Sequence, residues 1–148
     1  MLDDPDLKIL RTLQQNGRTK RNELAELVGL SVPSVSDRLK KLEENQIIEG
    51  YYTKVNRQAF GYDILAFILV VMDSSKHYKD LIKHVEKHPN ILECYSVLGE
   101  GSHLLKVTVK NTESLEKLLS EIQTWLGVTS TKTTYVLSTI KETTSINI

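Results

Sequence analysis

The side chains best suited to chemistry are basic and polar groups gathered between residues 18 and 41. Six of them are basic: Arg18, Lys20, Arg21, Arg38, Lys40 and Lys41. All five arginines of the chain lie in its first 57 residues, and the remainder uses lysine only. Guanidinium and ammonium groups bind phosphate, so this segment is a candidate for contact with a nucleic-acid backbone. The net charge of the chain is zero, which means that the local cluster, and not the overall charge, carries this indication.

The pattern around the cluster predicts the elements that would position it. In the segment 23–42, Leu24, Ala25 and Val28 recur at helical spacing, and Gly29 follows. A second apolar stripe comes after the glycine: Val32, Val35, Leu39 and Leu42. The spacing predicts a helix over about 21–28, a tight turn, and a second helix capped by Ser31. Two short helices joined in this way are typical of a helix-turn-helix, whose second helix fits the major groove of DNA.

The outward face of that second helix and its basic surroundings form the predicted DNA-binding surface. Its residues are Arg18, Lys20, Arg21, Ser31, Pro33, Ser34, Asp37, Arg38, Lys40 and Lys41. Ser34 can bond a base edge or a phosphate, and Asp37 can accept from a base edge, whereas the basic side chains bind phosphate and set the register. Two alternatives stay open: Asp37 pairs with a neighbouring lysine, or the lysines are ordinary solvated charges.

The rest of the chain supplies a further helix, a wing and a second domain. We expect a first helix after Asp4, with Pro5 in its first turn, and a two-stranded wing over 47–55. Beyond residue 62, strands and helices are predicted in the order βαββαβ, a ferredoxin-like arrangement. Their ranges are 64–73, 78–88, 91–98, 103–110, a helix capped by Thr112, and 129–141.

The first strand of the second domain, Ile64–Met72, is apolar at every position. Such a strand needs cover on both faces, yet two helices can cover only one face of a four-stranded sheet. We therefore expect a homodimer in which the other face meets a second copy. The alternative is that the helical half folds back over that face.

Several motifs together resemble the Lrp/AsnC (feast/famine) family of transcriptional regulators. They are the opening 2–10, Glu23-Leu24-Ala25, Gly29-Leu30-Ser31, Arg38, Leu42-Glu43, Ile48-Glu49-Gly50-Tyr51, the run 92–97 with Gly99, 104–107, Val136-Leu137 and Lys141. The resemblance covers essentially the whole chain. It implies an α+β protein with an N-terminal winged helix-turn-helix and a ferredoxin-like effector-sensing and dimerisation domain. It also implies dimers that assemble further, commonly into octamers, and a pseudo-palindromic site on double-stranded DNA.

The resemblance further implies an amino acid or related small molecule bound near the turn after the second strand of that domain. Carried over by position, the effector residues are Leu98, Gly99, Glu100, Gly101, Ser102 and His103. The chain departs from the family in that turn, because Ser102 and His103 replace the usual aspartate and aromatic residue. A plain turn without a ligand is the alternative. Gln46 also replaces a common glycine, so we expect Asn45 to end the helix, and Lys20 replaces a common serine cap, so we expect Thr19 to cap.

Other kinds of site are poorly supported. His84 and His88 have a spacing that can bind metal, but lysines crowd their helix and no H-E-x-x-H motif is present. Cys94, the single cysteine, lies in an apolar strand and is expected to be a structural thiol. We expect no enzyme, metal or cofactor. Without an export signal or a membrane-length apolar run, the expected location is the cytoplasm, away from membranes.

The expected domains are a winged helix-turn-helix over 1–50, a wing strand and linker over 51–62, and the effector and oligomerisation domain over 63–148. The expected function is sequence-specific, DNA-binding transcriptional regulation modulated by an amino acid or related metabolite. The competing hypotheses are an oligomeric small-molecule-binding or protein-interaction module, and a DNA-binding regulator without an effector.

Overall fold

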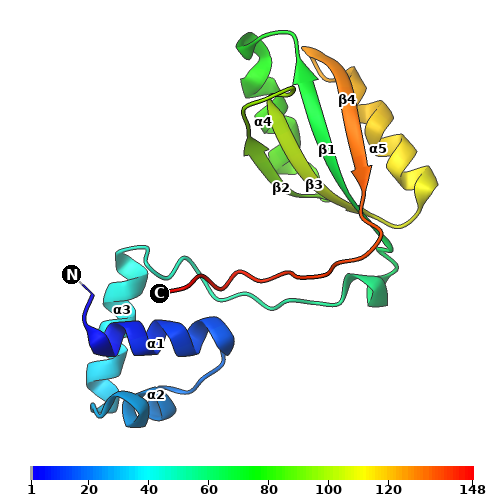
Figure 1. The fold of residues 1–148 in the computed structure, drawn as a ribbon. Helices are drawn as coiled ribbons and strands as arrows, with labels where there is room; N and C mark the ends of the chain where they lie inside the picture. The colour runs from blue at the N-terminus through cyan, green and yellow to red at the C-terminus, as the bar shows by residue number, and fades with distance from the viewer. Residues whose placement is uncertain (1) are drawn as a thin grey trace. The chain divides into compact units, whose positions relative to one another are not determined.

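The computed structural model of the protein describes residues 2–148, which divide into two compact units (Figure 1). The first unit comprises the described residues up to Lys54 together with Lys141–Ile148, and the second comprises Val55–Ile140. Within residues 2–148, no helix combines the length and the apolar character that crossing a membrane requires.

The first unit contains three helices, α1 (Asp4–Gln15), α2 (Arg21–Val28) and α3 (Val32–Glu44). Ile9 and Leu24 from the first two helices pack with Val35 and Leu39 from the third in a buried core. Gly29 ends α2 in the left-handed region, at φ 67°, and turns the chain toward α3. The helix pair and its glycine turn are therefore confirmed.

The helix starts differ in part from the predictions. Asp3, and not Asp4, caps α1: its carboxylate accepts from the N–H of Asp6 at 3.0 Å, and the Asp6 carboxylate accepts from the N–H of Asp3 at 3.2 Å. Lys20 occupies the cap position of α2, so the prediction for Thr19 is wrong. Ser31 caps α3 as predicted, accepting from the N–H of Ser34 at 3.3 Å.

The segment that follows α3 does not form the two strands expected over 47–55. The N–H groups of Ile47 and Ile48 both donate to the carbonyl of Leu42, at 2.9 and 3.1 Å, which folds the chain back onto the end of α3. The segment continues without strand pairing, and the hydroxyl of Tyr51 donates to Glu43 at 2.9 Å. Gln46, and not Asn45, takes the left-handed conformation, at φ 56°.

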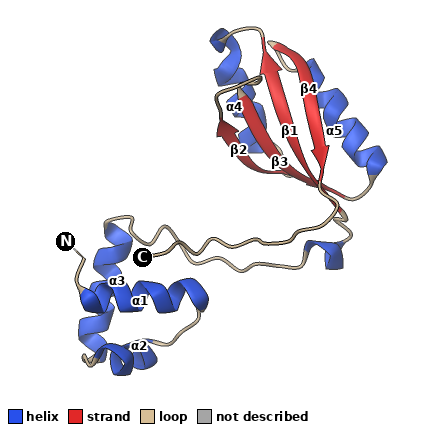
Figure 2. Cartoon of the chain, viewed as in Figure 1, coloured by secondary structure: helices blue, strands red, loops and turns tan. Residues whose placement is uncertain are grey.

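The last eight residues pack with the first unit and not with the second. The side-chain amide of Gln14 on α1 donates to the main-chain oxygen of Ile146 at 3.0 Å and accepts from its N–H at 2.7 Å. Arg11 Nε donates to the main-chain oxygen of Ile148 at 2.6 Å, and the Ile148 side chain packs on the core of the first unit. The last strand ends at Tyr135, and not at Lys141 as expected, and the chain after it continues as a loop (Figure 2).

The second unit is a four-stranded antiparallel sheet with two helices, and its strand order is β2-β3-β1-β4. The elements are β1 (Ile64–Met72), α4 (Tyr78–Lys87), β2 (Ile91–Ser96), β3 (His103–Val109), α5 (Thr112–Thr124) and β4 (Val128–Tyr135). Asn111, and not Thr112, caps α5. Short 3₁₀ turns precede β1 (Arg57–Phe60) and α4 (Ser75–His77). Both long helices lie on one face of the sheet, so the ferredoxin-like prediction is confirmed (Figure 1).

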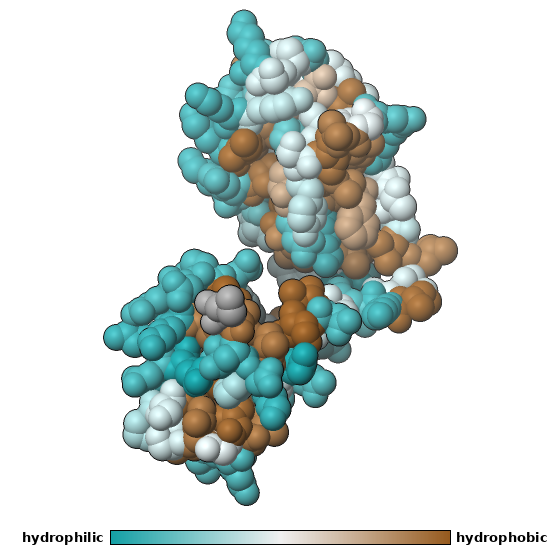
Figure 3. All heavy atoms as spheres, turned by 60° about the vertical axis from the view of Figure 1, so that its left-hand side comes forward, coloured by the Kyte–Doolittle hydropathy of each residue, from teal (hydrophilic) through white to brown (hydrophobic). Residues whose placement is uncertain are grey.

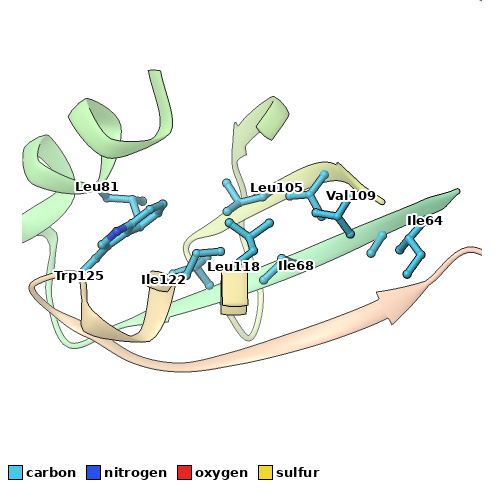
Figure 4. Close-up of a cluster of buried hydrophobic side chains, with 11 residues drawn as sticks. Ile64, Ile68, Leu81, Leu105, Val109, Leu118, Ile122 and Trp125 are labelled. Atoms are coloured by element: carbon cyan, nitrogen blue, oxygen red, sulfur yellow. The ribbon is translucent and has the colours of Figure 1, made fainter. Parts of the chain in front are cut away.

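The two faces of the sheet differ in cover. Ile68 of β1 and Leu105 of β3 point toward Leu81, Ile122 and Trp125 of the helical layer, and all five are buried (Figure 4). On the opposite, open face, Leu65 is buried, whereas Phe67, Leu69 and Val71 keep part of their surface exposed. Hydrophobic atoms reach the surface of both units in Figure 3. The apolar open face has no helix of its own unit to cover it.

Candidate DNA-binding surface and effector turn

The outward face of α3 is polar and exposed. Ser34, Asp37, Lys40 and Lys41 are exposed, whereas Val35 on the opposite side of the helix is fully buried. Pro33 is exposed in the first turn, where its missing N–H costs no helical hydrogen bond. The Ser31 hydroxyl is engaged as the helix cap and also bonds the Ser34 hydroxyl at 2.9 Å. The predicted base-contacting side chains thus share one exposed face.

The predicted phosphate contacts lie around that face. Arg18, Lys20 and Arg21 are exposed in the turn before α2 and in its first residue. Lys40 approaches Glu44 at 3.7 Å in an exposed pair one helical turn apart, which is worth little in water. Within residues 2–148, no ion pair engages Arg18, Lys20 or Lys41, so these cations face solvent.

Arg38 differs from the other cations of α3. One of its terminal nitrogens, Nη1, lies 2.8 Å from Asp3 Oδ1 and 2.8 Å from Asp6 Oδ1, both at the start of α1. Its side chain is 28% exposed, against 73% for Lys40. The hydrogen bonds that Arg38 donates to Asp6 and Asp3 raise the pKa of Arg38 above its usual value. The pKa of Asp3 is lowered mainly by the hydrogen bond that its carboxylate accepts from the Asp6 N–H, and to a smaller extent by the one that it accepts from Arg38.

The predicted effector turn connects β2 to β3. Leu98 is fully exposed, Gly99 has φ 127°, and the carboxylate of Glu100 pairs with Lys132 of β4. That pairing lowers the pKa of Glu100. At Gly101 an added Cβ would lie 2.6 Å from Leu69 Cγ and 2.9 Å from the carbonyl oxygen of Val70, so only glycine lets the turn lie against β1.

The end of the turn is more buried than its middle. The Ser102 N–H donates to the carbonyl of Val70 at 2.9 Å, and the Ser102 hydroxyl lies 2.8 Å from His103 Nδ1. His103 is only 4% exposed, and its ring meets the edge of Tyr78 at a centroid distance of 4.8 Å. Burial lowers the pKa of His103. The six predicted residues are thus brought together, although His103 points into the protein.

Two residues that contact this turn were not predicted from the sequence. Tyr78 begins α4 and Lys132 lies in β4, far from the turn in sequence. The pairing register of β1 with β4 is the one signal that could have indicated Lys132. In that register Lys132 lies opposite Leu69, and the Leu69 side chain lies beside Gly101 of the turn.

The histidine and cysteine side chains considered above as metal ligands or nucleophiles make packing and hydrogen-bond contacts within the second unit. His84 stacks on Trp125 at a centroid distance of 4.8 Å, and His88 Nε2 lies 3.1 Å from Glu121 Oε2. Cys94 is half-buried, and burial raises the pKa of its thiol. No grouping of three or more histidine, cysteine, aspartate or glutamate side chains able to hold a metal occurs among residues 2–148.

Comparison with known proteins agrees with this architecture. Residues 2–49 match the family described as winged helix-turn-helix DNA-binding, and residues 65–146 match the Lrp/AsnC ligand binding domain. An HTH-type transcriptional regulator of Pyrococcus furiosus, FL11, is 36% identical and aligns over 99% of this chain and 96% of its own.

Solved structures of whole chains are similar as well. A transcriptional regulator of Neisseria meningitidis in complex with L-Met has a TM-score of 0.93 at 32% identity, covering 99% of this chain and 97% of its own. A feast or famine regulatory protein of M. tuberculosis complexed with L-methionine has a TM-score of 0.91 at 34% identity, covering 99% of each chain. The names of the relatives are those of transcriptional regulators and not of enzymes.

Proposed function

Because the chain belongs to the Lrp/AsnC family of transcriptional regulators, we propose that it regulates transcription by inserting the outward face of α3 into the major groove. The observation that carries this proposal is the exposed polar face of α3 opposite a fully buried stripe. Ser34 and Asp37 contact base edges. Lys40 and Lys41, with Arg18, Lys20 and Arg21 beside them, contact phosphates.

The test is the salt dependence of DNA binding. A duplex recovered by selection from a random library is titrated with the wild-type protein and with the Lys41→Ala variant. Losing one phosphate contact should reduce the slope of log K against log salt by about 0.9. Lys83→Ala is the matched control, because it removes an exposed lysine of α4, outside the α3 surface, and changes the net charge equally. A slope unaffected by Lys41→Ala would remove this residue from the interface.

Dimerisation through the open face of the sheet is the second part of the proposal. Phe67, Leu69 and Val71 form an apolar strip between Lys106 and Lys132, and antiparallel register puts these cations opposite Phe67 and Leu69. A second copy would cover the strip, and larger assemblies such as octamers would build on the dimer. A dimer presents two α3 helices, so the DNA site is expected to be pseudo-palindromic.

Phe67→Asp tests the dimer, because it places a charge within the strip. Light scattering should give the mass of two chains or more for the wild type and of one chain for the variant. Ile82→Asp is a suitable control, because it places the same charge at an exposed apolar residue of α4, away from the open face of the sheet. Wild-type protein with the mass of one chain would overturn the proposal.

An amino-acid effector at the turn of residues 98–103 is the third part. Among residues 2–148, the structure gives no hydrogen-bond acceptor to the N–H groups of Gly99, Glu100 and Gly101, and such groups can hold a carboxylate. The Glu100 carboxylate, now paired with Lys132, would bind the effector ammonium. L-Methionine is the first ligand to test, because two similar proteins bind it.

The shift of the melting temperature on adding an amino acid tests whether the turn binds an effector. A ligand at about one hundred times its Kd stabilises the folded state by about 2.7 kcal/mol, which is a shift of several degrees. Glu100→Gln should abolish the shift, and Glu113→Gln, an exposed glutamate on α5, should leave it intact. No shift with any of the twenty amino acids would favour a DNA-binding regulator without an amino-acid effector.

A further inference from the structure

We infer that Arg38 is a positioning residue of the DNA-binding unit: it locks α3 to the start of α1 and does not touch DNA. This inference rests on the proposed insertion of α3 into the major groove. Of the basic residues predicted to contact DNA, Arg38 alone lies in the middle of α3 and is held by two carboxylates at 2.8 Å.

The helical position of Arg38 points away from the groove-facing side. At about 100° per residue, Arg38 lies about 70° from the centre of the stripe formed by Val35, Leu39 and Leu42, whereas Asp37 lies almost opposite that stripe. Its lower exposure agrees with this placement. The guanidinium therefore extends along the flank of α3 toward α1.

The two carboxylates are themselves held in place. Asp3 and Asp6 form the reciprocal capping box of α1, and Asp6 is only 13% exposed. Asp3 Oδ1 accepts from both the Asp6 N–H and Arg38 Nη1, so the cap of α1 and the anchor of α3 are one hydrogen-bond network. An arginine in such a network is already neutralised, and a phosphate would have to break two short bonds to recruit it.

A positioning role and a phosphate contact predict opposite results for Asp6. If Arg38 contacted phosphate, removal of the Asp6 charge would free the guanidinium and reduce repulsion, and DNA binding would tighten. If Arg38 positions α3, the same removal releases the helix and DNA binding weakens. The sign of the change therefore separates the two roles.

The experiment measures Kd for two duplexes over a range of salt concentrations. One duplex carries the selected sequence and the other a random sequence. The variants are Arg38→Gln, Asp6→Ala and Asp4→Ala, and the folded fraction of each is checked by circular dichroism. Asp4→Ala is the matched control, because Asp4 lies in the same turn of α1 but makes no contact with Arg38.

We expect Arg38→Gln and Asp6→Ala each to weaken binding to the selected duplex by about 5-fold or more, the effect of one lost base contact. Binding to the random duplex should change less, and the salt slope should remain that of the wild type. Asp4→Ala should bind DNA at least as tightly as the wild type. The double variant Arg38→Gln/Asp6→Ala should have a Kd no higher than that of whichever of its two single variants binds more weakly.

Two results would overturn the inference. One is a salt slope reduced by about 0.9 in Arg38→Gln, as for a lost phosphate contact. The other is Asp6→Ala binding as tightly as Asp4→Ala, and this comparison decides the matter even if Arg38→Gln does not fold. Wild-type protein that selects no duplex would instead reject the DNA-binding proposal, and this inference with it.

Discussion

Replacing Gly127 with alanine should destabilise the sheet unit more than the same replacement at Gly61. Both glycines belong to this unit and have similar left-handed backbones, at φ 84° and 76°. An added Cβ at Gly61 meets no atom within 4 Å. At Gly127 the Cβ would lie 2.7 Å from the Cβ of His77, an atom that moves only with its backbone.

The magnitudes follow from these two situations. At Gly61 the only cost is backbone strain, which is about 1–2 kcal/mol for an alanine in the left-handed region. The smaller entropy of the unfolded alanine chain offsets part of this cost. A net loss of about 1 kcal/mol is expected. At Gly127 the overlap with His77 adds about 1–3 kcal/mol, the usual cost of overpacking, for a total of about 2–4 kcal/mol.

Tryptophan fluorescence during urea unfolding reads out this unit alone, because Trp125 is the only tryptophan and is 5% exposed in the sheet core. Removing the opposing Cβ in a Gly127→Ala/His77→Gly double variant should recover the part of the loss due to overlap, measured as a coupling energy. Equal losses at Gly61 and Gly127, or no coupling with His77, would refute the reasoning.

Three further predictions concern single residues. Gln46→Gly should stabilise the first unit by about 0.5 kcal/mol, because glycine removes the strain of the left-handed backbone, and the larger entropy of its unfolded chain offsets part of that gain. Faster hydrogen exchange of the buried Leu39 amide in the variant would contradict this. Asp3 has a lowered pKa when folded, so its contribution to stability is complete above its usual pKa of 3.8 and is lost as the pH falls through the lower folded value. An acid titration followed by NMR should show α1 loosening in that range in the wild type but not in Asp3→Asn. His103 also has a lowered pKa, so stability should be complete above pH 6.5 and fall as the pH drops below it. Melting curves of the wild type and of His103→Gln would check this, and equal pH dependence would count against it.

Local periodicity was enough to predict the helices and, in the second unit, the order of strands and helices along the chain. The stripe that includes Val35 and Leu39 gave α3, and the uniformly apolar segment from Ile64 gave the central strand with an uncovered face. Gly29 marked the turn, because a left-handed residue there is easiest with glycine. These features depend on residues close in sequence, which pattern reasoning captures well.

The apolar pattern did not show several backbone and side-chain contacts, some of them local and others between residues distant in sequence. The wing strands failed because Ile47 and Ile48 bond back to the end of α3, which no alternation of apolar residues reveals. The bonds of Arg38 to residues 32 and 35 positions away likewise gave no signal in the sequence. The same holds for the pair of Glu100 and Lys132 that closes the effector turn.

The return of the last residues to α1 has a consequence for protein synthesis. Gln14 and Arg11 bond to partners 132 and 137 residues later in the chain, and the intervening residues include the whole sheet unit. Domains generally fold in the order in which they leave the ribosome. Here the helices made first gain their last packing partners only after the sheet has been made. A chimera that exchanges residues up to 54 must therefore also exchange residues 141–148.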